Sequence, residues 1–301
     1  MSGQIQRRVT KRNLAVVTCA VLCVMASPAS VLAESAAELL ELAGTKGGLI
    51  VHLGCGEGEL TARLRAGDQY FVHGLDTDAE KVAAARGHIM EQGTYGPVSA
   101  DKWDGRNLPY ADNLVNLVVA EKIENLSEDE LLRALAPGGV ALVRKQGQWK
   151  KVVKSRPTEM DEWTHYLHGP DGNPVANDSI VAPPERLQWI GSPRWSRHHD
   201  HTASLNALVS ASGRLFYILD EGPTASIQLP SRWRLIARDA FNGVILWKRE
   251  IEKWNTHQYP LKSGPAHLLR RLVAIGDRVY VTLGIDAPVT TLDAASGKTV
   301  L

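Results

Sequence analysis

A run of glycines near residue 55 is followed, 20 positions after Gly56, by a carboxylate at Asp76. The glycines alternate with two other residues directly after a compact apolar segment, as Gly54-Cys55-Gly56-Glu57-Gly58. Glycines let a backbone approach a ligand closely, and the amides that open the following helix can donate hydrogen bonds. An acidic side chain at this spacing is placed to accept hydrogen bonds from ribose hydroxyls. The pattern indicates a site that cradles a nucleoside.

Alternating strands and helices are expected to position these residues. Asp78 is the expected N-cap of one helix, a capping box of Ser127 and Glu130 opens another, and Pro137-Gly138-Gly139 ends it. This alternation predicts a parallel sheet with a ligand site at the carboxyl ends of its strands. The expected strands are 48–53, 70–75, 114–120 and 140–143, and the expected helices are 34–44, 59–65, 78–92 and 127–135.

Four motifs in this region resemble those of class I S-adenosylmethionine-dependent methyltransferases. Residues 51–58 (VHLGCGEG) look like their first motif, and Leu75-Asp76 resembles their ribose-binding position. Residues 108–119 and 131–143 are similar to their LPF-x-D stretch and to their helix–strand segment with a Pro-Gly-Gly turn. The resemblance covers residues 34–145 and implies an α/β Rossmann-like fold. A dinucleotide-binding Rossmann domain is the structural alternative.

The resemblance also implies S-adenosylmethionine as the cofactor. An insertion at 103–106 leaves open whether Asp101 or Asp104 faces the adenine. No catalytic residue is identified, since methyl transfer to a good nucleophile mainly needs positioning. The cofactor-binding residues that the resemblance implies are Gly54, Cys55, Gly56, Gly58, Asp76 and Asp101.

Two positions depart from the family's pattern. His52 stands where an acidic residue usually precedes the glycines, and Asn116 replaces the usual Asp of the fourth strand. A neutral imidazole can mimic part of the carboxylate's role, whereas a protonated one would repel an ammonium group. After Val143 a hairpin is expected over residues 144–154, where the family has a last helix and an antiparallel strand pair. Because those elements usually build the acceptor pocket, the methyl acceptor is unknown.

The first 33 residues have the pattern of a secretory signal peptide. Four basic residues precede an apolar run at 14–26, and small residues end at Ala33. The run is shorter than the roughly 20 residues of a membrane-spanning helix, so no span is expected in the mature chain. The pattern predicts export to the periplasm or cell envelope, with an uncleaved signal anchor as the alternative. Cleavage would leave Cys55 as the only thiol.

The length of 301 residues suits about two domains. With 44% hydrophobic and 22% charged residues, a disordered or polyelectrolyte chain is excluded. The net charge of +1 offers no basic surface, so no nucleic-acid partner is expected. The predicted organisation is a signal peptide at 1–33, a methyltransferase-like domain at 34–155, a Pro-, His- and Trp-rich connector at 156–204 and a repeat segment at 205–301.

The connector contains a histidine cluster, His198, His199 and His201, with Asp200 among them. Imidazole is the commonest metal ligand. Adjacent positions in a loop, however, do not make side chains converge on one ion. A solvated or hydrogen-bonded loop is therefore favoured over the alternative of a metal site, and no metal is predicted.

Two segments after residue 205 repeat each other. Residues 208–217 parallel 272–281, and the turn at 239–243 (DAFNG) parallels that at 293–297 (DAASG), with a longer loop near 223–233 in the first copy. Repeats of this length are typical of four-stranded propeller blades. The turn, followed by a strand ending in Trp247, resembles the quinoprotein-type repeat of pyrroloquinoline-quinone dehydrogenases and outer-membrane assembly lipoproteins. The tryptophan is expected to pack between blades.

The predicted fold is thus an α/β domain followed by an incomplete all-β propeller, in a fragment that ends inside a repeat. One blade and most of another cannot close a ring, and pyrroloquinoline quinone is not predicted as a cofactor. The favoured function is S-adenosylmethionine-dependent methyl transfer by an exported protein. The alternatives are a non-catalytic periplasmic scaffold that binds protein partners and a quinoprotein oxidoreductase.

Overall fold

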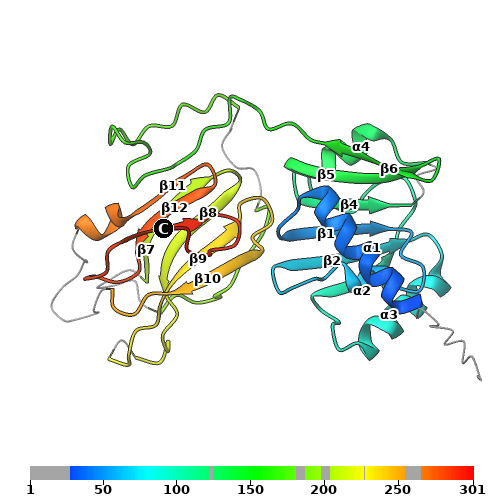
Figure 1. Ribbon diagram of the computed structural model, residues 1–301, viewed down its shortest axis with the longest axis horizontal. Helices are drawn as coiled ribbons and strands as arrows, with labels where there is room; N and C mark the ends of the chain where they lie inside the picture. Colours follow the sequence, from blue (N-terminus) through cyan, green and yellow to red (C-terminus); the bar gives the residue numbers. More distant parts are fainter. Residues whose placement is uncertain (1–27, 122–124, 181–186, 198–203, 227, 255–265) are drawn as a thin grey trace, which may run out of the picture.

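The computed structural model describes residues 28–301, except 122–124, 181–186, 198–203, 227 and 255–265. Two modules follow each other along the chain. The first, blue to green in Figure 1, is a sheet flanked by helices, and the second, yellow to red, consists of antiparallel strands. A long connector, drawn in green, passes from one to the other.

The first module is built on a six-stranded sheet in the order β3-β2-β1-β4-β5-β6. Its first five strands are parallel, and β6 pairs antiparallel with β5. The central strands are covered on both faces, which is why they appear in the sequence as continuous apolar runs. The strands are β1 Gly48–Leu53, β2 Tyr70–Asp76, β3 Val98–Lys102, β4 Val115–Ala120, β5 Leu135–Lys145 and β6 Gln148–Val153.

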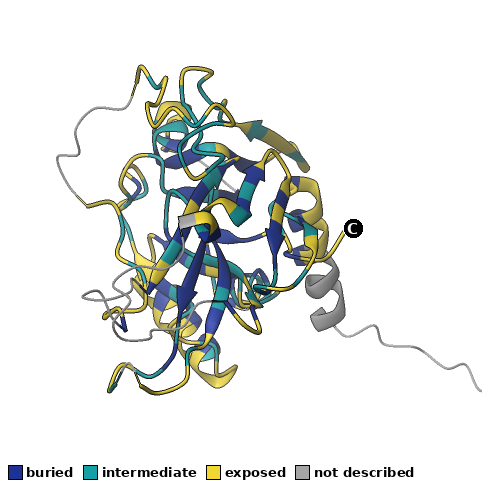
Figure 2. Ribbon diagram, turned by 90° about the vertical axis from the view of Figure 1, so that its left-hand side faces the viewer, coloured by how far each residue is buried: buried dark blue, intermediate teal, exposed yellow. Residues whose placement is uncertain are grey.

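Each face of this sheet has its own hydrophobic core. The helices α1, α2 and α3 contribute to one buried cluster, which includes Leu39, Ile50 and Ile89. The helix α4 and the loop between β3 and β4 cover the other face, around Val118 and Leu131. Figure 2 shows buried residues concentrated in the strands, with exposed loops around them. The helices are α1 Pro28–Ala43, α2 Glu59–Arg63, α3 Ala79–Glu91 and α4 Glu128–Ala134.

Most predicted elements of this module are confirmed. The side chain of Asp78 caps α3 by accepting a hydrogen bond from Glu80 N at 2.9 Å. The predicted hairpin joins β5 and β6 through Gln146 and Gly147, which both have positive φ (52° and 82°), the signature of a two-residue hairpin turn.

Three features differ from the predictions. The strand β3 was not predicted, because only two of its residues, Val98 and Ala100, are buried and apolar. The Pro-Gly-Gly segment lies inside β5 and not after a helix: α4 ends at Ala134, and β5 begins at once with an irregular register against β4. The helix α1 begins at Pro28, before the predicted cleavage site, and not at residue 34.

The second module consists of two antiparallel sheets, with strand orders β10-β9-β8-β7 and β11-β12-β13. They share one core, which includes Phe216, Trp254 and Leu272. The structure thus shows these two antiparallel sheets, and the propeller stays a prediction. The elements are β7 Leu205–Ala211, β8 Arg214–Asp220, β9 Trp233–Asp239, β10 Ile245–Glu250, the 3-10 helix η1 Ala266–Arg271, β11 Leu272–Ile275, β12 Arg278–Thr282 and β13 Val289–Asp293.

The sequence repeat is a repeat of structure. The two copies form the hairpins β7–β8 and β11–β12, and each of the two Asp-Ala-x-x-Gly turns receives an indole. Trp247 Nε1 donates to Ala294 O at 3.0 Å, so Trp247 of one sheet contacts the turn that follows the other. Trp189 Nε1 donates to Ala240 O at 3.0 Å in the same way. This second contact was not predicted, because Trp189 lies in the connector.

The two modules meet at the amino-terminal edge of the parallel sheet. Asn116, near the start of β4, donates from Nδ2 to Asp239 Oδ2 at 2.7 Å. Its Oδ1 accepts from Asn242 Nδ2 at 2.6 Å and from Leu49 N at 2.8 Å. Asn242 also donates to Leu114 O at 2.9 Å. The second module is therefore docked at the end of the strands opposite to the predicted ligand site.

The connector, residues 156–204, has neither helix nor strand among its described residues. Backbone contacts order it nevertheless: Ser210 N of β7 donates to Trp163 O at 2.7 Å, and Ala274 N of β11 donates to Thr164 O at 3.0 Å. It thus ties the two antiparallel sheets together. None of the helices in the described ranges combines the length and the hydropathy that a membrane span requires.

Candidate functional site

A cavity of about 390 Å³ lies at the carboxyl ends of β1, β2 and β4. Leu53 and Gly54 at the end of β1, Gly56 in the following loop and Asp76 at the end of β2 line it. Because neighbouring parallel strands end at the same edge of a sheet, the glycine loop and the acidic residue come together there. This is the edge at which the sequence predicted a ligand site.

The three glycines of the loop have different surroundings. All have positive φ, at 76° for Gly54, 54° for Gly56 and 87° for Gly58. A Cβ at Gly54 or Gly56 would meet nothing within 4 Å, so the backbone of both is open to the cavity. A Cβ at Gly58 would lie 2.9 Å from the Cα of Ala85 in α3. Gly58 therefore serves helix packing, and the first two glycines face the cavity.

Asp76 is buried beneath the cavity and holds the loop in place. Its Oδ2 accepts a hydrogen bond from Gly56 N at 3.1 Å, and its Oδ1 accepts from Asp78 N at 3.0 Å. A carboxylate offers about four lone-pair positions, so two amide donors leave it with acceptor capacity. The carboxylate thus orders the glycine loop and also lines the cavity.

Cys55, predicted to bind the cofactor, is buried below the loop. It packs so closely on β2 that a Cβ at Gly74 would lie 2.8 Å from the Cβ of Cys55. Burial, with a contribution from the nearby Asp76 carboxylate, raises the pKa of the Cys55 thiol to about 11. The thiol is therefore protonated at neutral pH, and the side chain is part of the core.

His52 is also buried, at the end of β1. Its Nδ1 lies 2.8 Å from the hydroxyl oxygen of Thr61 in α2, and the two form a hydrogen bond. Burial lowers the pKa of His52 to about 4, although the charge of Asp76 opposes the shift. The imidazole is therefore neutral at pH 7. Of the two states considered from the sequence, the structure supports the neutral one, in a residue that fastens α2 to the sheet.

Asp101 and Asp104, the two acidic residues considered as contacts of the adenine, bind other groups of the chain. Asp101 forms an ion pair with Arg86 and contacts His73 Nε2 at 3.0 Å. Asp104 is exposed, and hydrogen bonds from the backbone amides of its own loop lower the pKa of its carboxyl group. Neither lines the cavity, whereas Trp103, which stands between them in the sequence, does.

Charged groups of both signs surround the cavity. Lys81 reaches it from α3, and Glu121 reaches it directly after β4, opposite Asp76 in the strand order. Glu121 Oε1 is 3.8 Å from the guanidinium of Arg144, a loose ion pair at the surface. Two carboxylates and one ammonium group suit a polar ligand that carries charges of both signs.

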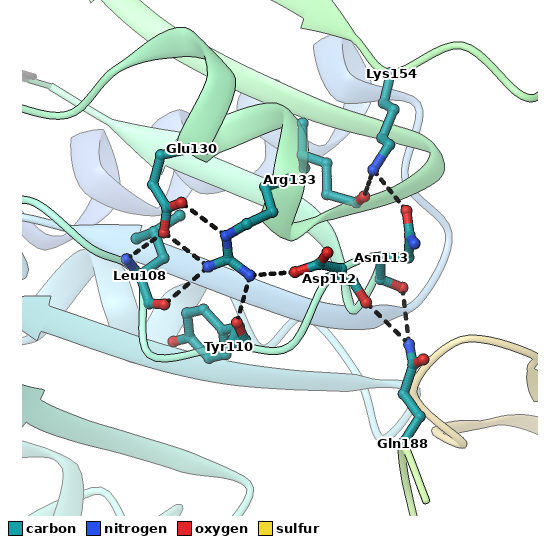
Figure 3. Close-up of polar contacts among 9 residues, drawn as sticks. Leu108, Tyr110, Asp112, Asn113, Glu130, Arg133, Lys154 and Gln188 are labelled. Carbon is teal, nitrogen blue, oxygen red and sulfur yellow. Dashed lines mark hydrogen bonds and ion pairs between the residues drawn. The ribbon is translucent and has the colours of Figure 1, made fainter. Parts of the chain in front are cut away.

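An arginine-centred network holds the loop between β3 and β4 (Figure 3). Trp103 and Gly105 of the same loop line the cavity. Arg133 of α4 donates to Glu130 Oε2 at 2.7 Å, to Tyr110 O at 2.8 Å and to Leu108 O at 3.1 Å. Glu130 Oε1 accepts from Leu108 N at 2.7 Å. The capping box is therefore half formed: Ser127 accepts from Glu130 N at 3.1 Å, while the Glu130 carboxylate binds the loop.

Residues 50–139 match the model of a family described as a methyltransferase domain. The matched segment contains the glycine loop, Asp76 and the central strands of the sheet. Residues 50–139 are a class I methyltransferase-like domain. The match covers less than a third of the chain and leaves the second module outside it.

Solved structures that resemble the methyltransferase-like domain include two methyltransferases and a cyclase. A proposed S-adenosyl-L-methionine-dependent methyltransferase from Methanococcus maripaludis is 20% identical over 40% of this chain and 58% of that one, with a TM-score of 0.36. The cyclase SpnF is 29% identical over 39% and 47%, with a TM-score of 0.33. Geranyl diphosphate C-methyltransferase from Streptomyces coelicolor is 18% identical over 36% and 44%, with a TM-score of 0.33. The chain thus spans about half the length of these structures, and no curated protein matches it.

Within the part of the chain that the structure describes, no three or more His, Cys, Asp or Glu side chains gather as a metal site would require. The cluster of His198, His199, Asp200 and His201 lies outside the described residues.

The cavity-lining residues that were not predicted to bind the cofactor include Lys81, Trp103 and Glu121. Glu121 follows β4 directly, and residues at the carboxyl ends of parallel strands generally face the ligand site, so its position was a usable signal. Trp103 follows β3, but that strand was itself not predicted. Lys81 lies in a helix with many charged residues, and nothing in the sequence separates it from its solvated neighbours.

Proposed function

We propose that the methyltransferase-like domain binds S-adenosylmethionine in this cavity and uses it as a methyl donor. One observation carries the proposal: two glycines with open backbone, Gly54 and Gly56, converge with the Asp76 carboxylate at the carboxyl edge of the sheet. The segment that brings them together is the one that matches the methyltransferase family. The open glycine backbone, the acceptor capacity of Asp76 and the family match therefore support a nucleoside ligand.

The residues of the cavity have distinct roles toward such a ligand. Gly54 and Gly56 allow it to approach the backbone, because no side chain fills that space. Asp76 accepts hydrogen bonds from the ribose hydroxyls with its remaining lone pairs. Glu121 adds negative charge on the β4 side, where it attracts a positively charged sulfonium group.

When bound, S-adenosylmethionine supplies an electrophilic methyl group. The chain's part in the reaction is to orient this group toward the acceptor, since transfer to a good nucleophile depends mainly on positioning. Among the described residues, those that line the cavity all belong to the first module. Because the second module docks at the opposite edge of the sheet, it leaves the cavity uncovered for an acceptor.

Calorimetric titration of the full chain with S-adenosylmethionine tests this proposal. We expect saturable binding, and we expect Asp76→Ala to weaken it by about 10-fold or more, because hydrogen bonds to a charged acceptor contribute about 1.5–3 kcal/mol. Asp68→Ala is the matched control, since Asp68 is exposed and pairs with Arg65 at the surface. A thermal melt of each variant checks folding. A wild-type chain that releases no heat with millimolar ligand contradicts the proposal.

A second candidate function is a scaffold that binds protein partners without methyl transfer. The contacts of Asn116 favour the scaffold function. This residue stands where the family has an acidic residue, and its side-chain amide binds Asp239 and Asn242 of the second module. In that case the domain retains the fold as a support for the second module. The same titration separates the two functions, because the scaffold requires no S-adenosylmethionine.

We further propose that the second module is part of a quinoprotein-type propeller. The two antiparallel sheets and the two turns that each receive an indole, from Trp189 and Trp247, support this proposal. We assign no pyrroloquinoline quinone to these two sheets, so the oxidoreductase function depends on further blades. Electron microscopy of the natural gene product tests the proposal: we expect a closed ring of sheets, and two sheets without a ring contradict it.

We also propose that the protein is exported, on the sequence pattern of residues 1–33. Cleavage after Ala33 would leave the buried α1 residues Ala36, Leu39, Leu40 and Ala43 in place on the sheet. Mass spectrometry of the protein from its natural host tests this: we expect a chain that begins at Glu34 in the extracytoplasmic fraction. An intact leader in the cytoplasmic fraction contradicts it.

A further inference from the structure

The wall of the cavity that follows β3 presents an aromatic residue, Trp103. Trp103 N donates to Asp76 O at 3.1 Å, which fixes its backbone beside the acidic residue of the site. Its side chain packs against a core cluster that includes Leu53 and Leu126, and both leucines also line the cavity. The indole is therefore half-buried at the boundary between the core and the cavity.

Asp101 is committed to partners other than a ligand. Its carboxylate pairs with the Arg86 guanidinium and with His73 Nε2, and His73 Nδ1 in turn lies 2.7 Å from the hydroxyl of Tyr110. The guanidinium of Arg86 in α3 and the imidazole of His73 in β2 therefore fix the direction of this carboxylate. Asp101 does not line the cavity, which agrees with these contacts.

The Asp104 carboxylate accepts hydrogen bonds from residues of its own turn. Its Oδ1 accepts from Arg106 N at 2.7 Å and from Asn107 N at 2.9 Å, and its Oδ2 accepts from Asn107 Nδ2 at 3.3 Å. The neighbouring Gly105, at φ +80°, brings its backbone to the cavity. This end of the cavity therefore presents an indole and glycine backbone, with both nearby carboxylates turned to other partners.

We propose that Trp103 binds the base of the nucleoside by stacking, and that neither Asp101 nor Asp104 reads the amino group of the base. This inference rests on the proposed function, because it requires a nucleoside in the cavity. Stacking uses the π face that every base has, so it tolerates changes at the base edge. A carboxylate that accepted a hydrogen bond from the adenine amino group would reject a base with a carbonyl there. The site therefore tolerates a change of the 6-substituent of the purine.

Calorimetry of the full chain with S-adenosylhomocysteine and S-inosylhomocysteine tests this inference. We expect the two dissociation constants to agree within about 3-fold, because stacking is insensitive to the edge of the base. Trp103→Ala raises both by about 10-fold or more, and Trp103→Phe, which keeps an aromatic face, raises them much less. Asp101→Asn leaves the ratio between the ligands unchanged. A strong preference for the adenine ligand, or wild-type affinity in Trp103→Ala, overturns the inference.

Fluorescence gives a second readout that does not depend on the stability of the alanine variant. The chain has eight tryptophans, and stacking of a base on one indole quenches its emission. We expect Trp103→Phe to lose the ligand-induced quenching, and Trp195→Phe, which changes an exposed indole of the connector, to keep it. If the wild-type chain binds neither ligand, the proposed function itself fails. If it binds both and quenching persists in Trp103→Phe, the stacking role alone is overturned.

Discussion

At His52 the chain lacks the acidic residue of the family's pattern, yet its glycine loop is still held in place by a carboxylate. The resemblance placed an acidic residue at this position, where a carboxylate would order the glycine loop. In this chain Asp76 holds the loop through Gly56 N, and His52 binds Thr61 beneath it. The carboxylate that orders the loop in this chain therefore lies at the end of β2, at Asp76. The residue type at 52 was evident from the sequence, but its neutral state depends on burial, which only the fold determines.

The burial of His52 predicts a pH dependence of stability. Its pKa is lowered to about 4 in the folded chain from an ordinary value of 6.5, so the unfolded chain binds more protons between these values. The free energy of unfolding therefore falls as the pH drops from about 6.5 to 4, by about 3 kcal/mol from this residue. Urea unfolding at several pH values checks this. We expect His52→Asn, whose amide can still bond to Thr61, to show a weaker dependence, and parallel curves contradict the account.

At the scale of elements, apolar runs and caps were sufficient to predict most of the first module. The runs at β1 and β4 are buried on both faces, β2 is buried toward its carboxyl end, and Asp78 caps α3 as its position indicated. Two elements could not be predicted from local pattern. The edge strand β3 has few buried residues, and β5 includes a Pro-Gly-Gly segment because its register against β4 is irregular there. Pairing across the sheet, not local preference, decides both.

The glycine loop gives a prediction at the same scale. Gly58→Ala combines positive φ with a contact of 2.9 Å to the backbone of Ala85, whereas Gly56→Ala meets only the unfavourable φ. We expect Gly58→Ala to lower the free energy of unfolding by about 2–4 kcal/mol and Gly56→Ala by about 1 kcal/mol. Chemical denaturation measures both. Equal losses would show that the close approach of α2 and α3 contributes nothing.

At the scale of the whole molecule, the junction of the modules explains the second departure from the family's pattern. Asn116 needs both a donor and an acceptor, because it faces the Asp239 carboxylate and also the amides of Asn242 and Leu49. An aspartate at 116 would repel Asp239. The sequence revealed the substitution and both Asp-Ala-x-x-Gly turns, but not that one of these turns docks on the sheet. Residues 123 positions apart meet there only through the fold.

Exchanging the amide at position 116 and the carboxylate at position 239 tests this junction. Asn116→Asp places two carboxylates together, and we expect it to destabilise the junction and to split one thermal unfolding transition into two. Adding Asp239→Asn should restore the single transition, because Asp239 Oδ1 accepts the backbone amides while its Oδ2 faces Asn116. The amide that Asp239→Asn introduces can then donate to the carboxylate at position 116. Differential scanning calorimetry measures this, with Asn173→Asp on the exposed connector as the control. A double variant no better than Asn116→Asp contradicts the direct pairing.

The central claim is that the cavity between the glycine loop and Asp76 holds an adenosyl group. The most direct test is a crystal structure of the full chain with S-adenosylhomocysteine at saturating concentration. We predict density with the ribose hydroxyls at hydrogen-bond distance from the Asp76 carboxylate and the base against Trp103. An empty cavity in such crystals, or a ligand bound elsewhere on the chain, would contradict the account.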